Sequence, residues 1–277
     1  QAFLGCHFNN IVFYDTLKNV GEKSFPKCTF GHIRINANSA PRFQSGNDNA
    51  QFAEDMDRLL YFSERKKMIF FGGCSMSYGL DSDMVQKAFP EYTVLNMSVI
   101  GGSNASIQLD CILPYLKEGD VFVHAPEEMS TFQHLQNCHM DSRSYIMLEG
   151  NYDYLKDADL SLIGNVFDAF SEYVEVREYF QNQSYQDYNA NYNQYGDICI
   201  EREDGPEDSY FDLESCFLQS YDYSLLDSYY GKMKKKGVRV LFSFAPLNLN
   251  AVEREENSEG KKKEYVGSLQ SLRKQVD

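Results

Sequence analysis

The sequence has 277 residues, of which 43% are hydrophobic and 24% charged, a composition typical of one large globular domain with additions. The formal net charge of -15 argues against sequence-independent binding to nucleic acid or anionic lipid, so we expect a small-molecule or glycan ligand. No apolar run is long enough to span a membrane, and Gln1 begins without the pattern of a secretion signal.

The first 60 residues are predicted to form a lead-in that packs on the main domain. They mix short apolar runs with turn-rich polar stretches, which indicates a few strands and one helix at about 50–62. We assign this lead-in no chemistry. The main domain is predicted to span 61–277, with a helical and loop insertion at about 139–236.

Three units of strand followed by helix are predicted from residue 67 onward. The strands are expected at 68–71, 93–96 and 121–124, and the helices at 82–89, 104–116 and 127–135. Strands that alternate with helices at this spacing favour a parallel sheet covered on both faces. We therefore predict an α/β fold, a three-layer α/β/α sandwich with a mostly parallel sheet.

The insertion and the C-terminal part follow. Apolar residues at helical spacing predict helix in the second half of 139–180, and polar composition predicts a long surface excursion over 181–197 and 201–214. The sheet pattern then returns. We expect a helix at 221–236 that Gly237 ends, a central strand at 238–246 and a last helix at about 260–274.

The turn after the strand predicted at 68–71 is the strongest candidate site. Ser75 comes directly after the strand and before a helix, which places its hydroxyl at the carboxyl edge of a parallel sheet. Glycines on both sides allow a tight turn, and the start of a helix directs N–H groups toward developing negative charge. A serine that merely caps the helix is the structural alternative.

The motif reads G-x-S-x-x-x-G over Gly73–Gly79, which differs from the G-x-S-x-G of α/β-hydrolases. It resembles the first block of the SGNH (GDSL-like) hydrolase superfamily, G-D-S-x-x-x-G, with Cys74 where the family usually has Asp. The stretch Asn96–Gly101 resembles the second block, N-x-[GS]-x-x-G. The resemblance, to a divergent bacterial branch, implies a flavodoxin-like SGNH fold. It also implies that Ser75 is the nucleophile and that the Ser75 and Gly101 N–H groups form the oxyanion hole.

Two further blocks of that family are not matched. Where G-x-N-D is expected, the chain reads HAPEE, and Glu127 takes approximately the place of the Asn. A carboxylate there repels an oxyanion unless it is protonated or turned away, so Glu127 is expected to bind a substrate hydroxyl or to support a neighbouring donor. No D-x-x-H is present, and no histidine follows His139. We expect the segment with the base to lie beyond Asp277; the alternatives are an inactive protein and His124 as a substitute base.

The predicted site thus has two parts. Ser75 and Gly101 are the catalytic candidates, and the substrate-binding candidates are Cys74, Asn96, Gly102, His124 and Glu127. Seven cysteines without a C-x-x-C pair indicate no zinc ribbon or thioredoxin-like site, and we expect neither metal nor cofactor.

Two function classes remain open. The leading hypothesis is an SGNH-type serine esterase or O-acyltransferase acting on acyl esters, above all acetyl esters, of a carbohydrate or cell-surface glycan. The alternative is a catalytically inactive SGNH-fold module that binds glycan or a partner protein. A flavodoxin-like nucleotide binder fits less well, because no P-loop or G-x-G-x-x-G follows the first strand. The acidic, Tyr-rich and Asn-rich composition favours an extracellular or cell-surface location over a cytoplasmic one.

Overall fold

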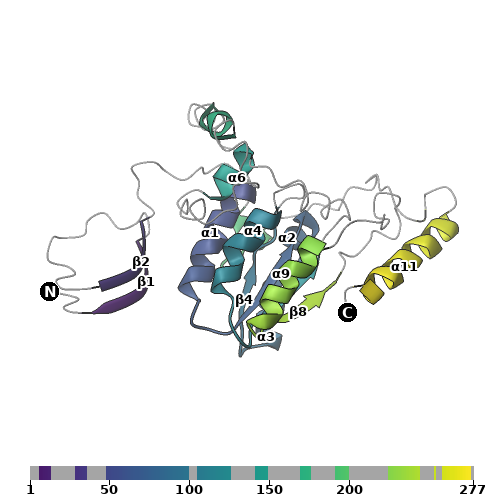
Figure 1. Cartoon of the computed structure of the whole chain (residues 1–277), viewed down its shortest axis with the longest axis horizontal. Coiled ribbons are helices and arrows are strands. Elements are labelled where there is room, and N and C mark those ends of the chain that lie inside the picture. Colours follow the sequence, from purple (N-terminus) through teal and green to yellow (C-terminus); the bar gives the residue numbers. More distant parts are fainter. Residues whose placement is uncertain are drawn as a thin grey trace. The chain divides into compact units, whose positions relative to one another are not determined.

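The computed structural model in Figure 1 has an α/β fold and describes ten stretches of the chain. These are residues 6–13, 29–35, 48–99, 105–125, 141–148, 169–175, 191–199, 224–243, 253 and 258–275. The chain divides into two compact units, one made of 1–65 and 140–189 and the other of 66–139 and 190–277. This division groups 140–189 with the N-terminal residues, whereas the sequence predicts 139–236 as an insertion in the main domain at 61–277.

The second unit contains a four-stranded parallel sheet. Its strands are β3 (Lys67–Gly72), β4 (Thr93–Asn96), β5 (Val121–Ala125) and β8 (Arg239–Phe242), in the order β4-β3-β5-β8. The chain therefore moves from β3 to one side for β4 and to the other side for β5. All three pairings are parallel, so the carboxyl ends of the strands lie at one edge of the sheet.

The strands form because short apolar runs alternate their side chains between two covered faces. One face carries a buried cluster of Met68, Phe70, Val94 and Val121, against which pack Met76, Leu80, Val85, Tyr92, Val123 and Tyr195. The other face carries Phe71, Phe122 and His124, whose rings lie side by side. Burying such side chains contributes about 1.5–3 kcal/mol each, so this sheet is the core of the unit.

Five α-helices are described in this unit, and all but the first match predicted ones; the helix predicted at 127–135 lies outside the described residues. They are α2 (Cys74–Gly79), α3 (Ser82–Ala88), α4 (Ala105–Ile112) with the 3-10 turn η1 (Leu113–Tyr115), α9 (Ser224–Lys235) and α11 (Ser258–Gln275). The side chain of Asp81 caps α3 by accepting the N–H of Met84 at 2.9 Å. Figure 1 shows α4 and α9 next to each other, and Tyr229 Oη donates to Ser106 O at 3.3 Å between them.

Gly237 ends α9, as predicted. It has φ of +78°, and the N–H groups of Gly237 and Val238 donate to the carbonyls of Lys234 and Met233 at 3.0 and 3.1 Å. These two bonds form a Schellman motif, for which a left-handed residue is required. A side chain at Gly237 would also meet Glu118 Cγ at 2.9 Å, so glycine is needed on both grounds.

Lys236, the residue after α9, contacts the end of another helix. Lys236 Nζ donates to three carbonyl oxygens, those of Leu113 at 2.8 Å and of Pro114 and Leu116 at 3.2 Å. These carbonyls belong to the end of α4–η1 and the residue after it, where helix carbonyls lack partners within the helix. The ammonium of Lys236 therefore fastens the end of one helix to the end of another.

The strand β8 is shorter than predicted, and its central place in the sheet stays a prediction. We expected a central strand over 238–246, but β8 covers Arg239–Phe242 and pairs only with β5 among the described residues. Its side chains alternate between exposed and half-buried, and Leu241 is 39% exposed. In the described part of the sheet β8 is therefore an edge strand.

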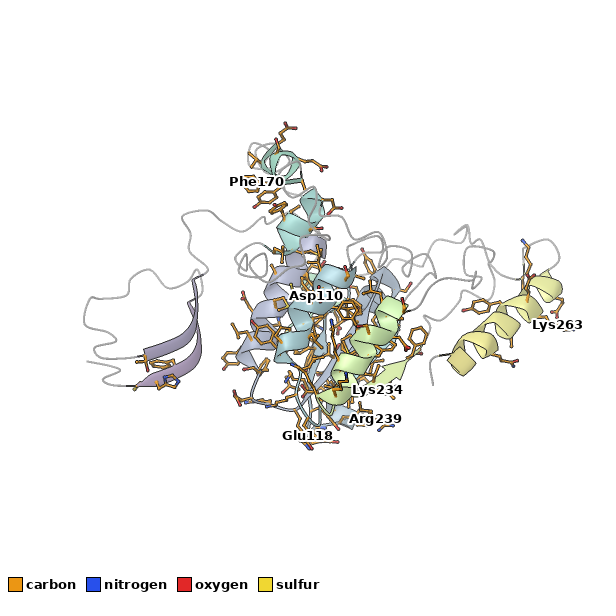
Figure 2. The ribbon with its side chains drawn as sticks, in the orientation of Figure 1. Asp110, Glu118, Phe170, Lys234, Arg239 and Lys263 are labelled. Carbon is orange, nitrogen blue, oxygen red and sulfur yellow. The ribbon has the colours of Figure 1, made fainter. Side chains whose placement is uncertain are left out.

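A buried ion pair holds the amino edge of the sheet. Lys67 Nζ lies 2.9 Å from Asp120 Oδ2, and both side chains are fully buried. The same carboxylate accepts the N–H groups of Lys67 and Lys117, each at 2.9 Å. Glu118 and Arg239 lie at this end of the unit in Figure 2. The carboxylate thus joins the start of β3 to the turn before β5.

The first unit contains a parallel pair of strands and three described helices. The strands are β1 (His7–Phe13) and β2 (Thr29–Ile35), and the helices are α1 (Asp48–Tyr61), α6 (Ser142–Met147) and a short helix at 169–175. Phe52, Met56 and Leu59 of α1 are buried. Tyr145 stacks on Tyr173 and meets Phe170 edge-on, and Phe170 is labelled in Figure 2.

Candidate active site

Ser75 occupies the predicted position between a strand and a helix. It is the second residue of α2, which begins directly after β3 and Gly73, and its side chain is exposed. The carbonyl of Gly73 accepts the N–H groups of Met76 and Ser77 at 3.1 and 3.2 Å, so the helix starts at this glycine. Ser75 therefore stands in the first turn of α2, at the carboxyl edge of the sheet.

The glycine that the turn requires is Gly72. A Cβ atom at this position would come within 2.4 Å of the carbonyl oxygen of Ala125, its partner on β5. Gly73 has an ordinary extended conformation with φ of -96°, and nothing lies within 4 Å of a Cβ placed on Gly79. The close approach of β3 and β5 just before Ser75 thus depends on one glycine, and not on the two that flank the serine in the motif.

Asn96 joins the Ser75 turn to the segment after β4. Its side chain is fully buried, and its Nδ2 donates to Met76 O at 3.4 Å. Its Oδ1 accepts the N–H of Ser98 at 3.2 Å. The amide therefore bridges α2 and the turn that follows β4. Its burial favours a role in holding these backbones; direct contact with substrate stays a prediction.

The segment after β4 runs alongside the end of β3. Met97 N donates to Phe70 O at 2.8 Å, and Val99 N donates to Gly72 O at 3.3 Å. Val99 is the last described residue before Gly101 and Gly102, which lie outside the described residues. Glu127 and the side chain of Cys74 also lie outside them, so the roles of these four residues stay predictions.

His124 is buried near the end of β5, on the face that α9 contacts. Its Nδ1 lies 2.6 Å from Tyr230 Oη, and the rings of Phe71 and Phe242 lie within 5.6 Å of its own. Burial lowers the pKa of His124 to about 3 and raises the pKa of Tyr230 well above 10. The imidazole is therefore neutral at pH 7 and too weakly basic to suit a general base that operates there.

A hairpin that the sequence analysis did not identify completes this end of the unit. Strands β6 (Asn191–Tyr192) and β7 (Ile198–Cys199) form an antiparallel pair, and Tyr195 O accepts the N–H of Asn96 at 2.7 Å. Gly196 and Asp197 are buried, so the prediction of a surface excursion is wrong for this end of 181–197. The available signal was the turn-forming NQYGD stretch between Tyr192 and Ile198.

Asp197 is the buried charge of the hairpin. Its carboxylate accepts the Ser82 hydroxyl at 2.6 Å, the Ser82 N–H at 3.0 Å, Asn96 Nδ2 at 2.9 Å and Asn193 Nδ2 at 2.9 Å. These donors come from the start of α3, the end of β4 and the hairpin itself. Asp197 therefore ties three segments together beside the Ser75 turn.

Comparison with protein-family models, curated proteins and solved structures returned no match. Within the described ranges, no group of three His, Cys, Asp or Glu side chains is placed to hold a metal ion. In the same part of the chain, no helix is both long and apolar enough to cross a membrane.

Proposed function

We propose that this chain is an SGNH-type serine esterase or O-acyltransferase that acts on acyl esters, above all acetyl esters, of a carbohydrate or cell-surface glycan. One observation carries the proposal: Ser75 is exposed in the turn after β3, at the carboxyl edge of a parallel sheet. Of the next two strands in the chain, β4 lies on one side of β3 and β5 lies on the other. Ligands of open α/β sheets bind at such a reversal of strand order, so Ser75 has the position that a nucleophile needs.

The strand order also supports the finer fold that we propose, a three-layer α/β/α sandwich of the flavodoxin-like SGNH type. In chain order the sheet runs second, first, third, fourth, which agrees with the flavodoxin-like arrangement. Residues Met76 of α2 and Val85 of α3 pack on one face, and Tyr230 of α9 reaches His124 on the other. Helices on both faces are what this fold requires.

In the proposed reaction, Ser75 Oγ attacks the ester carbonyl carbon while a base takes its proton. The tetrahedral intermediate places negative charge on the carbonyl oxygen, which the N–H groups of Ser75 and Gly101 stabilise. Collapse of this intermediate breaks the bond to the alcohol, which leaves with the proton from the base. Water or a sugar hydroxyl then takes the acyl group from Ser75 by the same steps in reverse.

Two features support this assignment of the oxyanion hole. The N–H of Ser75 belongs to the first turn of α2, where N–H groups are directed toward negative charge. The bond from Val99 N to Gly72 O brings the segment that leads to Gly101 beside the turn that leads to Ser75. His124 is too weakly basic for this role, so the base is proposed to be the histidine of the D-x-x-H block that the resemblance implies.

Turnover of p-nitrophenyl acetate by the wild type, Ser75→Ala and Ser77→Ala tests the proposal. Ser77 lies in the same helix but is fully buried, so the same substitution there leaves the nucleophile in place. We expect kcat to fall by a factor of about 10³ or more in Ser75→Ala and to be unchanged in Ser77→Ala. Equal turnover in the wild type and Ser75→Ala excludes Ser75 as the nucleophile.

The inactive glycan-binding module remains the second candidate, and the position of His124 favours it. His124 is the one histidine in the described part of the second unit, and burial keeps its pKa far below neutral. If the full chain binds an acetylated glycan but neither the wild type nor Ser75→Ala releases acetate, the module is correct. Acetate release by the wild type but not by Ser75→Ala supports the enzyme and excludes the inactive module.

A further inference from the structure

The carboxylate of Asp197 is surrounded by donors that carry no charge. The residue is 5% exposed, and each of its oxygens accepts two hydrogen bonds. No cation pairs with it among the described residues, so backbone and side-chain dipoles compensate the desolvation of the charge. Because the two oxygens only accept hydrogen bonds, each group bonded to them must turn an N–H or O–H toward the carboxylate.

The donor that matters for the candidate site is Asn96. An ionised carboxylate only accepts hydrogen bonds, so the side of the amide that faces Asp197 must be Nδ2. The other side is then Oδ1, which accepts the N–H of Ser98. The same Nδ2 also reaches Met76 O, one residue after Ser75. With the amide reversed, Oδ1 would face both the Asp197 carboxylate and Met76 O, and Nδ2 would face an N–H.

We infer that Asp197 is a positioning residue for the Ser75 site. Acting through Asn96, its carboxylate holds the first turn of α2 against the segment that leads from β4 to Gly101. Asp197 does not touch the reacting atoms. It lies 101 residues after Asn96 in the chain, so the β6–β7 hairpin becomes part of the machinery that sets the geometry of the site. The catalytic consequence rests on the function proposed above, whereas the effect on the backbone does not.

The test is Asp197→Asn, which keeps the size of the side chain and removes its charge. The new amide must turn its N–H₂ either toward Asn96 Nδ2 and the Ser82 hydroxyl or toward the Ser82 N–H and Asn193 Nδ2, and either choice sets donor against donor. We expect kcat for p-nitrophenyl acetate to fall by about 10- to 100-fold with KM within about twofold, as misplaced catalytic groups predict. The matched control is Asp83→Asn, which removes an exposed carboxylate from α3 that pairs with Lys87. This control is expected to keep the wild-type kcat.

An exchanged pair separates the bond to α2 from the bond between the two side chains. Asn96→Asp with Asp197→Asn restores a hydrogen bond between the two positions in the reverse direction and still lets position 96 accept the Ser98 N–H, but it leaves Met76 O without its donor. We expect this double variant to keep the lowered kcat. A recovered kcat in the double variant, or a wild-type kcat in Asp197→Asn, overturns the inference. If Asp197→Asn does not fold, Asp197→Glu moves the acceptor by one methylene, and a wild-type kcat in that variant overturns it equally.

Amide hydrogen exchange provides a readout that does not depend on catalysis. The N–H of Ser98 is bonded to Asn96 Oδ1, and we expect it to exchange about tenfold faster in Asp197→Asn than in Asp83→Asn. The N–H of Phe122, in the centre of the sheet, is expected to exchange at the same rate in both. If Ser75→Ala turns over substrate like the wild type, the proposed function fails and exchange alone decides. Unchanged exchange at Ser98 then overturns the positioning role.

Discussion

The buried imidazole of His124 makes the stability of the protein depend on pH. Burial lowers its pKa to about 3, whereas a histidine in an unfolded chain has a pKa of about 6.5. Between these values the unfolded chain binds a proton that the folded chain does not, so acid favours unfolding. The stability that His124 contributes is complete above the unfolded pKa and is lost as the pH falls toward 3. At about 1.36 kcal/mol per pH unit, this residue lowers the free energy of unfolding by about 2 kcal/mol between pH 7 and pH 5.

Urea unfolding at pH 7 and pH 5 measures this effect when the wild type is compared with His124→Gln. The carboxylates titrate in both proteins, so the difference between the two pH dependences isolates the imidazole. We expect His124→Gln to lose about 2 kcal/mol less than the wild type over this interval. Tyr230→Phe removes the hydroxyl 2.6 Å from Nδ1 but keeps the burial, and its pH dependence is expected to match the wild type. An equal loss in the wild type and His124→Gln would refute the reasoning.

Two further substitutions test the packing around the sheet. Gly72→Ala forces a Cβ to within 2.4 Å of Ala125 O and is expected to lower the free energy of unfolding by about 1–3 kcal/mol. Gly79→Ala, where the space is open, is the control and is expected to raise it by about 0.5 kcal/mol; equal urea midpoints contradict the close approach of β3 and β5. Asp120→Asn takes the charge from beside the fully buried Lys67 and is expected to lower the free energy of unfolding by about 3 kcal/mol. A loss below about 1 kcal/mol in urea unfolding contradicts that burial.

Local sequence patterns predicted most of the elements around the site. The strand expected at 93–96 is β4, and the helix expected at 82–89 is α3, which ends one residue earlier. These elements could be predicted because each is a short apolar or amphipathic run between polar or glycine residues. The position of β8 in the sheet could not be predicted, because the local pattern indicates a strand but not the strands next to it. Strand order depends on contacts between segments far apart in the chain.

The residues of the candidate site also differ in whether a local sequence pattern could predict their place. The place of Ser75 follows from a strand and a helix next to it in the sequence, and the structure has both. The burial of His124 also had a local signal. Side chains alternate between the two faces of a strand, so His124 lies opposite Val123 and on the same face as the apolar Phe122. Asp197 had none of this kind. It is polar and lies in a polar stretch, and three of its four hydrogen bonds, those from Ser82 and Asn96, form only when the hairpin meets distant segments of the chain.

The two edges of the sheet hold their buried carboxylates in different ways, and the difference indicates different roles. At the amino edge, Asp120 is neutralised by Lys67, and the pair fastens β3 to the turn before β5. At the carboxyl edge, Asp197 is held by neutral donors alone among the described residues. The donors around Asp197 offset the desolvation of its charge, so the burial of the carboxylate is not by itself evidence of a net gain in stability. What it does supply is direction, because every group bonded to it must present an N–H or O–H. The edge that carries Ser75 is therefore the one where the buried charge constrains geometry, here the amide of Asn96 between α2 and the segment toward Gly101.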